Sequence, residues 1–222
     1  MSNSTTLANM RVRARRAADM DQTQFVTDNE VNDWVNASLS ELHDIMVMSF
    51  EDYYEKELTI NVIAGQDTYL LPLDFLKAQG VDANVGGITY SVPRYMASER
   101  NVYKSFPGTA FGGVLGMYYR IVGNELRFIP TPVATVATLR YIRQFQPLVT
   151  DTDLVDQVIP QGWEEYSVVD VAARMAIKEE SDAGPFIQQK ESLSSRIMAA
   201  AETRDAQEPY RVTDVTSNGW WG

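Results

Sequence analysis

The sequence predicts an α+β protein in which a four-helix bundle carries an inserted antiparallel β-module and ends in an extended C-terminal tail. Apolar residues recur at helical spacing before residue 58 and after residue 147, and the segment between them changes to a period of two. Two apolar helix stripes at each end of the chain can close one core, so a β-insertion within a bundle is the economical arrangement. The expected segments are 1–57, 58–147, 148–204 and 205–222.

Two helices are expected in the N-terminal segment. The first spans about 7–18, behind Thr5 and Thr6, either of which can cap its first turn. The second begins at Thr27, which is followed three residues later by Glu30 in the pattern of a capping box. An apolar stripe of about 20 residues follows at helical spacing, which makes this helix a long one.

The middle segment is expected to form strands. Residues 58–62 alternate and are rich in β-branched side chains, 65–67 turn the chain, and 68–71 should return as the antiparallel partner. Gly123 and Asn124 form a two-residue connection typical of a tight hairpin. The glycine-rich segment 106–113 is a candidate contact loop. Further strands are expected at 88–92, 118–122, 125–129 and 138–145.

Helical spacing resumes in the C-terminal part of the chain. Pro160 is expected in the first turn of a helix, where its missing N–H would have no intrahelical partner. Gly184 and Pro185 then break the chain and start another helix, which ends near residue 204. In that last helix Lys190 falls among apolar residues that lie close to a heptad seam.

Composition and motifs argue against an enzyme. The 222 residues include no cysteine and one histidine, which excludes thiolate and imidazole metal clusters, and we expect neither a metal nor a cofactor. His43 is interpreted as a surface or bundle-edge residue rather than a catalytic base. Residues 151–156 offer three carboxylates, but the chain lacks the glycine and glutamate that complete an EF-hand loop, so a solvated loop before a helix is favoured.

The net charge of −11 argues against a protein that coats nucleic acid. No apolar run approaches the ~20 residues that span a bilayer, and the polar first residues do not resemble a signal peptide. We therefore expect no contact with a membrane, and residence in the cytosol until the chain is assembled.

A basic cluster lies in the first predicted helix and consists of Arg11, Arg13, Arg15 and Arg16. These arginines can bind DNA phosphates or pair with an acidic surface of another subunit. Pairing is favoured, because residues 21–57 contain ten acids and one lysine.

The tail 205–222 carries apolar side chains that have no local partner. Tryptophan is a preferred anchor in interface pockets, so docking on another protein subunit is favoured for these residues. Folding back on the chain's own helices and disorder remain alternatives. The candidate anchors are Tyr210, Val212, Val215, Trp220 and Trp221.

In their order and spacing, several segments resemble the head-to-tail adaptor proteins of tailed bacteriophages, which are also described as portal-bound connectors. The capped helix TDNEVNDWVNA and the turn GQDTYLLPLDF are similar to segments of that family, as are the strand NELRFIPTP, the strand after it, TLRYIR, and the helix start IPQGWEEY. These segments lie at 27–37, 65–75, 124–132, 138–143 and 159–166, and the resemblance covers about residues 7–204.

The resemblance implies a structural virion protein of the neck or tail. Such adaptors form a homo-oligomeric ring, commonly of about twelve copies, that binds the portal protein, extends the DNA channel and meets tail or nozzle proteins. In this family the C-terminal segment often reaches the portal. Acidic helices facing the lumen would repel DNA and leave only transient, non-specific contact with it. Candidate channel-facing acids are Glu41, Asp44 and Glu51.

Two alternatives to the adaptor remain. One is a distal tail-tube or nozzle subunit, which would also form a ring but attach farther from the portal. The other, of a different class, is a cell-wall hydrolase of the phage neck. That activity needs a convergent acid pair or a metal site, and the sequence offers neither.

Overall fold

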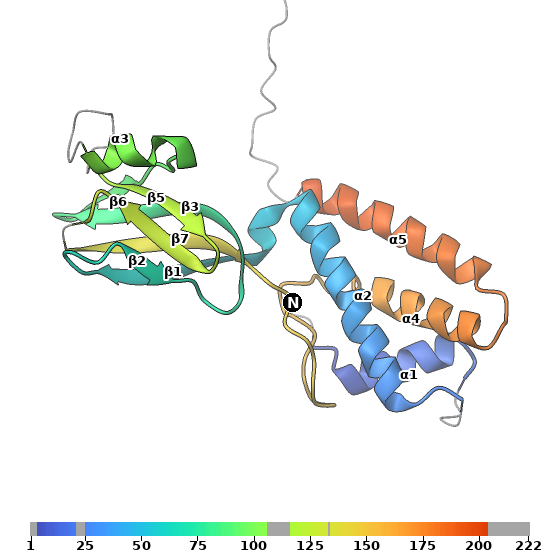
Figure 1. Cartoon of the computed structure of the whole chain (residues 1–222). Helices are drawn as coiled ribbons and strands as arrows, with labels where there is room; N and C mark the ends of the chain where they lie inside the picture. The colour runs from blue at the N-terminus through green and yellow to red at the C-terminus, as the bar shows by residue number, and fades with distance from the viewer. Residues whose placement is uncertain (1–3, 21–24, 106–115, 133, 204–222) are drawn as a thin grey trace, which may run out of the picture.

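The computed structural model describes residues 4–20, 25–105, 116–132 and 134–203. Within these residues the fold is α+β, with five α-helices and two antiparallel sheets. Figure 1 shows two lobes, one built from α1, α2, α4 and α5 and the other from the sheets and α3. The α+β class expected from the sequence is confirmed, whereas a regular four-helix bundle stays a prediction.

The four helices of the helical lobe contribute to one apolar core, together with Val155 and Ile159 from the segment before α4. The expected N-terminal caps are confirmed. The Thr6 hydroxyl accepts a hydrogen bond from the Asn9 N–H at 3.2 Å, and Thr27 and Glu30 form both bonds of the capping box. The helices span Leu7–Ala17 (α1), Asp28–Ser49 (α2), Glu165–Lys178 (α4) and Gly184–Glu202 (α5).

The β-lobe contains a four-stranded sheet in the order β1-β7-β3-β4 and a three-stranded sheet in the order β2-β6-β5. The sheets share a core in which Leu126, Phe128 and Leu139 are fully buried. The strands are Glu55–Val62 (β1), Thr68–Leu70 (β2), Phe75–Val85 (β3), Ile88–Ser91 (β4), Tyr118–Val122 (β5), Glu125–Ile129 (β6) and Thr135–Arg143 (β7). Short helices occupy Glu51–Tyr54 (η1), Ala97–Glu99 (η2) and Arg100–Ser105 (α3).

The expected pairing of residues 58–62 with 68–71 is wrong. Strand β1 pairs along its whole length with β7, and β2 pairs with β6 in the other sheet. The turn itself is present, with a hydrogen bond from the Gln66 N–H to the Ile63 carbonyl at 3.1 Å, but it carries the chain from one sheet to the other. Eight residue pairs with β7 provide a longer ladder than the three residues of β2 could offer.

The hairpin around Gly123 is confirmed, because β5 and β6 pair in register from Val122 opposite Glu125. Strand β3 and helix α3 were not predicted from the sequence pattern. Strand β3 lacks a clean alternation because its register against β7 shifts twice between Phe75 and Gly80. It turns into β4 through Gly86 and Gly87, both with positive φ, as a tight hairpin requires.

The start of the helix after Pro160 is also corrected, since α4 begins at Glu165. Pro160 instead accepts a turn hydrogen bond from the Trp163 N–H at 3.1 Å. Gly162 has a φ of +97°, which no right-handed helix contains, so the helix cannot begin before it. The predicted start of the last helix at Gly184 and Pro185 is confirmed.

Some expectations lie outside the described residues. They include the candidate loop 106–113 and the tail anchors Tyr210, Val212, Val215, Trp220 and Trp221. Among the helices that are described, none combines the length and apolar character needed to cross a bilayer.

Candidate interaction surfaces

The N-terminal arginines lie on α1 against acidic groups of the same chain. Arg11 binds Asp151 through two hydrogen bonds of 3.0 and 3.1 Å, and its Nε lies 3.7 Å from Asp28. The hydrogen bond to Asp151 is the main cause that raises the pKa of Arg11 above its usual value, against the opposing effect of burial. This pair fixes α1 to the loop before α4.

Two further arginines reinforce this attachment. Arg13 contacts Glu164, at 3.4 Å, and Glu165 at the start of α4. Arg15 is buried and donates to Asp28 at 2.7 Å and to the Val26 carbonyl at 2.8 Å. The acidic helix α2, which was expected to pair with arginines of another subunit, therefore supplies Asp28 to arginines of its own chain. Arg16 is exposed and makes no ion pair with the residues that the structure describes.

The three aspartates of segment 151–156 face different partners. Asp151 binds Arg11, and Asp156 binds Arg143 at the end of β7. Asp153 accepts hydrogen bonds from the backbone N–H groups of Val149 and Thr150 at 2.7 and 2.8 Å. The segment is a partly exposed loop before α4, as expected, and its three carboxylates also anchor it within the chain. Among the described residues no group of three His, Cys, Asp or Glu side chains could hold a metal ion.

His43 lies at the junction of the two lobes. Its side chain is 2% exposed, so the expectation of a surface position is wrong, whereas the alternative of a position at the edge of the bundle agrees with the contact to β7. Its Nε2 lies 3.0 Å from the Arg143 carbonyl oxygen, and its ring packs 4.2 Å from that of Tyr54. The Arg143 guanidinium lies 5.1 Å from the Tyr54 ring centroid, and burial raises the pKa of the Tyr54 phenol. These contacts join α2, η1 and β7.

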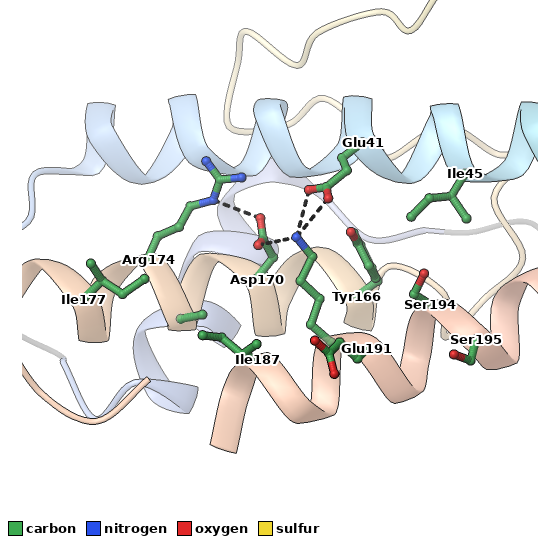
Figure 2. Close-up of a pocket in the computed structure, with 12 residues that line it drawn as sticks. Glu41, Ile45, Tyr166, Asp170, Arg174, Ile177, Ile187, Glu191, Ser194 and Ser195 are labelled. Atoms are coloured by element: carbon green, nitrogen blue, oxygen red, sulfur yellow. Dashed lines mark hydrogen bonds and ion pairs between the residues drawn. The ribbon is translucent and has the colours of Figure 1, made fainter. Parts of the chain in front are cut away.

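A groove of about 640 Å³ opens between α2, α4 and α5 (Figure 2). At its floor the Lys190 ammonium donates to Asp170 at 2.8 Å and to both carboxylate oxygens of Glu41 at 2.9 and 3.0 Å. The second oxygen of Asp170 accepts from Arg174 Nε at 2.9 Å. The ammonium also lies 5.1 Å from the Tyr166 ring centroid. One lysine on α5 therefore connects all three helices.

Burial and ionic contacts have opposite effects on the pKa of Lys190. Burial alone would lower the pKa of Lys190, but its hydrogen bonds to Asp170 and Glu41 outweigh that effect and raise the pKa above its usual value. Asp170 is buried beneath the ammonium, with two cationic partners. Both carboxylates are engaged by cations. The floor of the groove thus holds helices together.

The mouth of the groove is of a different character. Ile177 and Ile187 are exposed there, on α4 and α5, and Ile45 lies on α2 (Figure 2). Glu191, Ser194 and Ser195 complete the rim. Apolar side chains bordered by polar and charged ones are typical of a protein contact surface.

The chain matches the family model described as SU10 adaptor protein over residues 5–213. The chain belongs to the SU10 adaptor protein family. The match spans both lobes of this SU10 adaptor and confirms the resemblance to phage head-to-tail adaptors. A search of curated proteins found no match. An adaptor is a structural phage protein that works through contacts with portal and tail proteins generally, so membership favours contact surfaces over catalysis.

The sequence identified some residues of the SU10 adaptor's surfaces and missed others. It singled out the α1 arginines and Glu41, but not Asp170 or Arg143. The sequence did indicate that Lys190 has a structural role, because a cation within an apolar helix stripe indicates a buried ionic partner. The partner itself is visible only in the structure. Asp44 is exposed on α2, and the side chain of Glu51 lies outside the description.

Proposed function

We propose that this adaptor forms a ring of about twelve copies at the virion neck, docks on the portal and extends the DNA channel toward the tail. The match to the SU10 adaptor family across most of the chain carries this proposal. The internal ion pairs of the helical lobe support it, because a ring subunit that transmits load between portal and tail benefits from well-fixed helices.

The tail 205–222 is the proposed portal-docking segment. It provides five large or β-branched apolar side chains, two of them adjacent tryptophans, in an otherwise polar stretch. Aromatic anchors of this kind fill pockets on a partner protein. In this proposal Tyr210, Val212, Val215, Trp220 and Trp221 bind the portal.

Acidic side chains on α2 and η1 are the proposed lining of the channel. Of the three candidates Glu41, Asp44 and Glu51, Asp44 carries the proposal best, because Glu41 is already bound by Lys190. Negative charge toward the lumen would let DNA slide past. Asp44→Lys should slow genome ejection from intact particles, with Asp33→Lys, another exposed α2 acid, as the matched comparison.

Arg16 is the arginine proposed for contact with a neighbouring subunit or DNA. Arg11, Arg13 and Arg15 contribute to the same surface indirectly, by fixing α1 to α2 and α4. Pairing with a subunit is preferred over DNA because the chain as a whole is acidic.

Quantitative mass spectrometry of purified, DNA-filled particles tests the proposal. We expect a ratio of this protein to the portal protein near one, with density for it directly below the portal in cryo-electron microscopy. A ratio of about one half, with density at the far end of the tail, would indicate a nozzle subunit instead. Absence from the particle would overturn the structural role and make a neck-associated hydrolase worth assaying.

A further inference from the structure

Several basic residues of the β-lobe are already engaged within the chain. Lys56, Arg127, Arg140 and Arg143 form ion pairs, and Lys77 also has an interaction partner. Four others make no ion pair with any residue in the described part of the chain, and we call them the basic cap: Arg94, Arg100, Lys104 and Arg120. Their charges are available to a partner.

The fold gathers the basic cap at one end of the β-lobe. Tyr103 of α3 stacks on Tyr118 of β5, with ring centroids 4.1 Å apart. Arg120 is two residues beyond Tyr118 and lies on the same face of β5, so α3 covers the face that presents it. Arg94 and Arg120 also line one hollow of about 500 Å³.

Apolar side chains are interspersed with these cations. Met96, which lines the same hollow, is 69% exposed, and Val102 is exposed on α3. Arg100 and Lys104 are four residues apart and both exposed, so they share one side of that helix. The cap is therefore a mixed basic and apolar surface.

The opposite kind of surface surrounds the turn between α4 and α5. We call it the acidic turn and define it by Glu179, Glu180, Asp182 and Glu191, all of which are exposed. The cations closest to it in sequence are already bound: Arg174 to Asp170, Lys178 to Glu30 and Lys190 to Asp170 and Glu41. The acidic excess of the turn is thus not neutralised by these neighbours.

The acidic turn also has exposed apolar neighbours. Ile177 is 60% exposed and Ile187 is 43% exposed, and both lie at the mouth of the groove in Figure 2. Each end of the molecule thus combines charge of one sign with exposed apolar side chains. The two surfaces are complementary in charge and alike in apolar content.

Figure 1 places α3 on the outer part of the β-lobe and the turn between α4 and α5 at the far end of the helical lobe. Because the two complementary surfaces lie at opposite ends of the folded molecule, they cannot contact each other within one copy. They associate head to tail, and such a heterologous contact generates a ring when its rotation closes. We propose that the basic cap of one copy docks on the acidic turn of the next copy.

This inference rests on the proposed ring and names its subunit interface. A second copy of the chain accounts for more features of the basic cap than bound DNA would. Phosphates would neutralise the cap but leave Met96 and Val102 without apolar partners. They would also leave the acidic turn unused, whereas a second copy covers both surfaces with one contact.

Cross-linking in assembled particles tests the interface. The chain has no cysteine, so Val102→Cys and Ile187→Cys introduce unique thiols at two exposed positions, one on each surface. We expect a short bismaleimide to produce a ladder of adaptor multimers from the double variant and none from either single variant. Adaptor dimers from a single variant would indicate a two-fold contact and overturn the proposal.

Charge reversal provides a second measurement. Two double variants reverse the charge of one surface each. The cap variant carries Arg94→Glu and Arg120→Glu, and the turn variant carries Glu179→Lys and Glu191→Lys. We expect each to lower the adaptor content of particles at least tenfold. Combining all four changes should restore it, because opposite charges then face each other again. Arg196→Glu, an exposed change on α5 that belongs to neither defined surface, is the matched control and should leave the content unchanged.

The outcomes separate this inference from the proposed function. A normal adaptor content in all reversal variants, without cross-linked ladders, overturns the interface and leaves the adaptor role standing. Absence of the wild-type chain from particles overturns the adaptor role itself. Rings that persist in the cap variants while DNA retention weakens and depends less on salt concentration would assign the cap to phosphate and overturn docking between copies.

Discussion

Lys190 is the residue on which the packing of three helices depends. Replacing it with methionine keeps the length of the side chain but removes the ammonium from between Asp170 and Glu41. Among the described residues, buried Asp170 would then keep Arg174 alone as a cationic partner. Because the lysine is partly exposed, we expect a loss of about 1–3 kcal/mol in the free energy of unfolding, below the cost of breaking a fully buried pair.

Urea unfolding measures this loss. Arg196→Met is the matched control, because Arg196 is an exposed cation on the same helix. The control should change the free energy of unfolding by no more than about 0.5 kcal/mol. Equal effects of the two substitutions would contradict the structural role of Lys190.

Buried phenols predict a loss of stability at alkaline pH. Burial is the main cause that raises the pKa of Tyr141 from 10.0 to about 12, and a hydrogen bond from its hydroxyl to Asp74 adds to it. Burial also raises the pKa of Tyr166 to about 12. Above pH 10 the unfolded chain releases these protons while the folded chain retains them, so stability is full below pH 10 and falls as pH rises toward 12.

Guanidinium unfolding at a series of pH values between 9 and about 12 measures this dependence, with a slope of up to about 1.4 kcal/mol per pH unit for each such phenol. Tyr141→Phe removes one titrating group and should make the slope shallower. A slope unchanged by that substitution would show that Tyr141 does not contribute to it.

At the scale of the element, α2 depends on its first turn. Thr27 and Glu30 satisfy backbone N–H groups that have no partner within the helix. Thr27→Ala should therefore reduce the free energy of unfolding by about 1 kcal/mol. The midpoint of chemical denaturation reports it, and Asn29→Ala, an exposed change in the same turn, serves as the comparison and should have a smaller effect.

Strand β7 is the element that organises the larger sheet. It lies between β1 and β3, and Leu139 at its centre is fully buried. Leu139→Ala should cost about 2–5 kcal/mol, because the cavity it leaves cannot collapse inside a sheet paired on both sides. Val136→Ala on the same strand removes a side chain that is 44% exposed and should cost much less. Similar losses for both would argue against this packing.

At the scale of the whole molecule, the two lobes are joined through side chains as well as through the backbone. His43, Tyr54 and Arg143 pack together where α2, η1 and β7 meet, and Asp156 binds Arg143 from the segment before α4. This junction fixes how the basic cap and the acidic turn are oriented relative to each other. The geometry of the proposed ring therefore depends on it.

The C-terminal tail is expected to act separately from this body. Deleting residues 205–222 should abolish docking on the portal but leave the folded chain intact, because no core residue lies beyond Ala201 in the described chain. Pull-down with purified portal measures docking, and circular dichroism with thermal unfolding checks the fold. Trp220→Ala with Trp221→Ala should reproduce much of the loss. Portal binding retained by the deletion would refute the proposed role of the tail.

Local features of this protein were determined by the sequence alone. The caps at Thr6 and Thr27, the hairpin at Gly123 and the helix start at Gly184 each depend on groups only a few residues apart, so neighbouring residues are sufficient to predict them. The family could also be inferred, because the order of such local segments persists along the chain.

Only the tertiary structure decided which distant groups meet. The pairing of β1 with β7, the carboxylates that bind the α1 arginines and the position of Lys190 between Asp170 and Glu41 all join residues far apart in the chain. Each contact competes with every other possible pairing. The arrangement that forms is the one that buries most apolar surface without leaving a buried charge unpaired. Since that competition involves the whole chain at once, no single segment of the sequence carries its result.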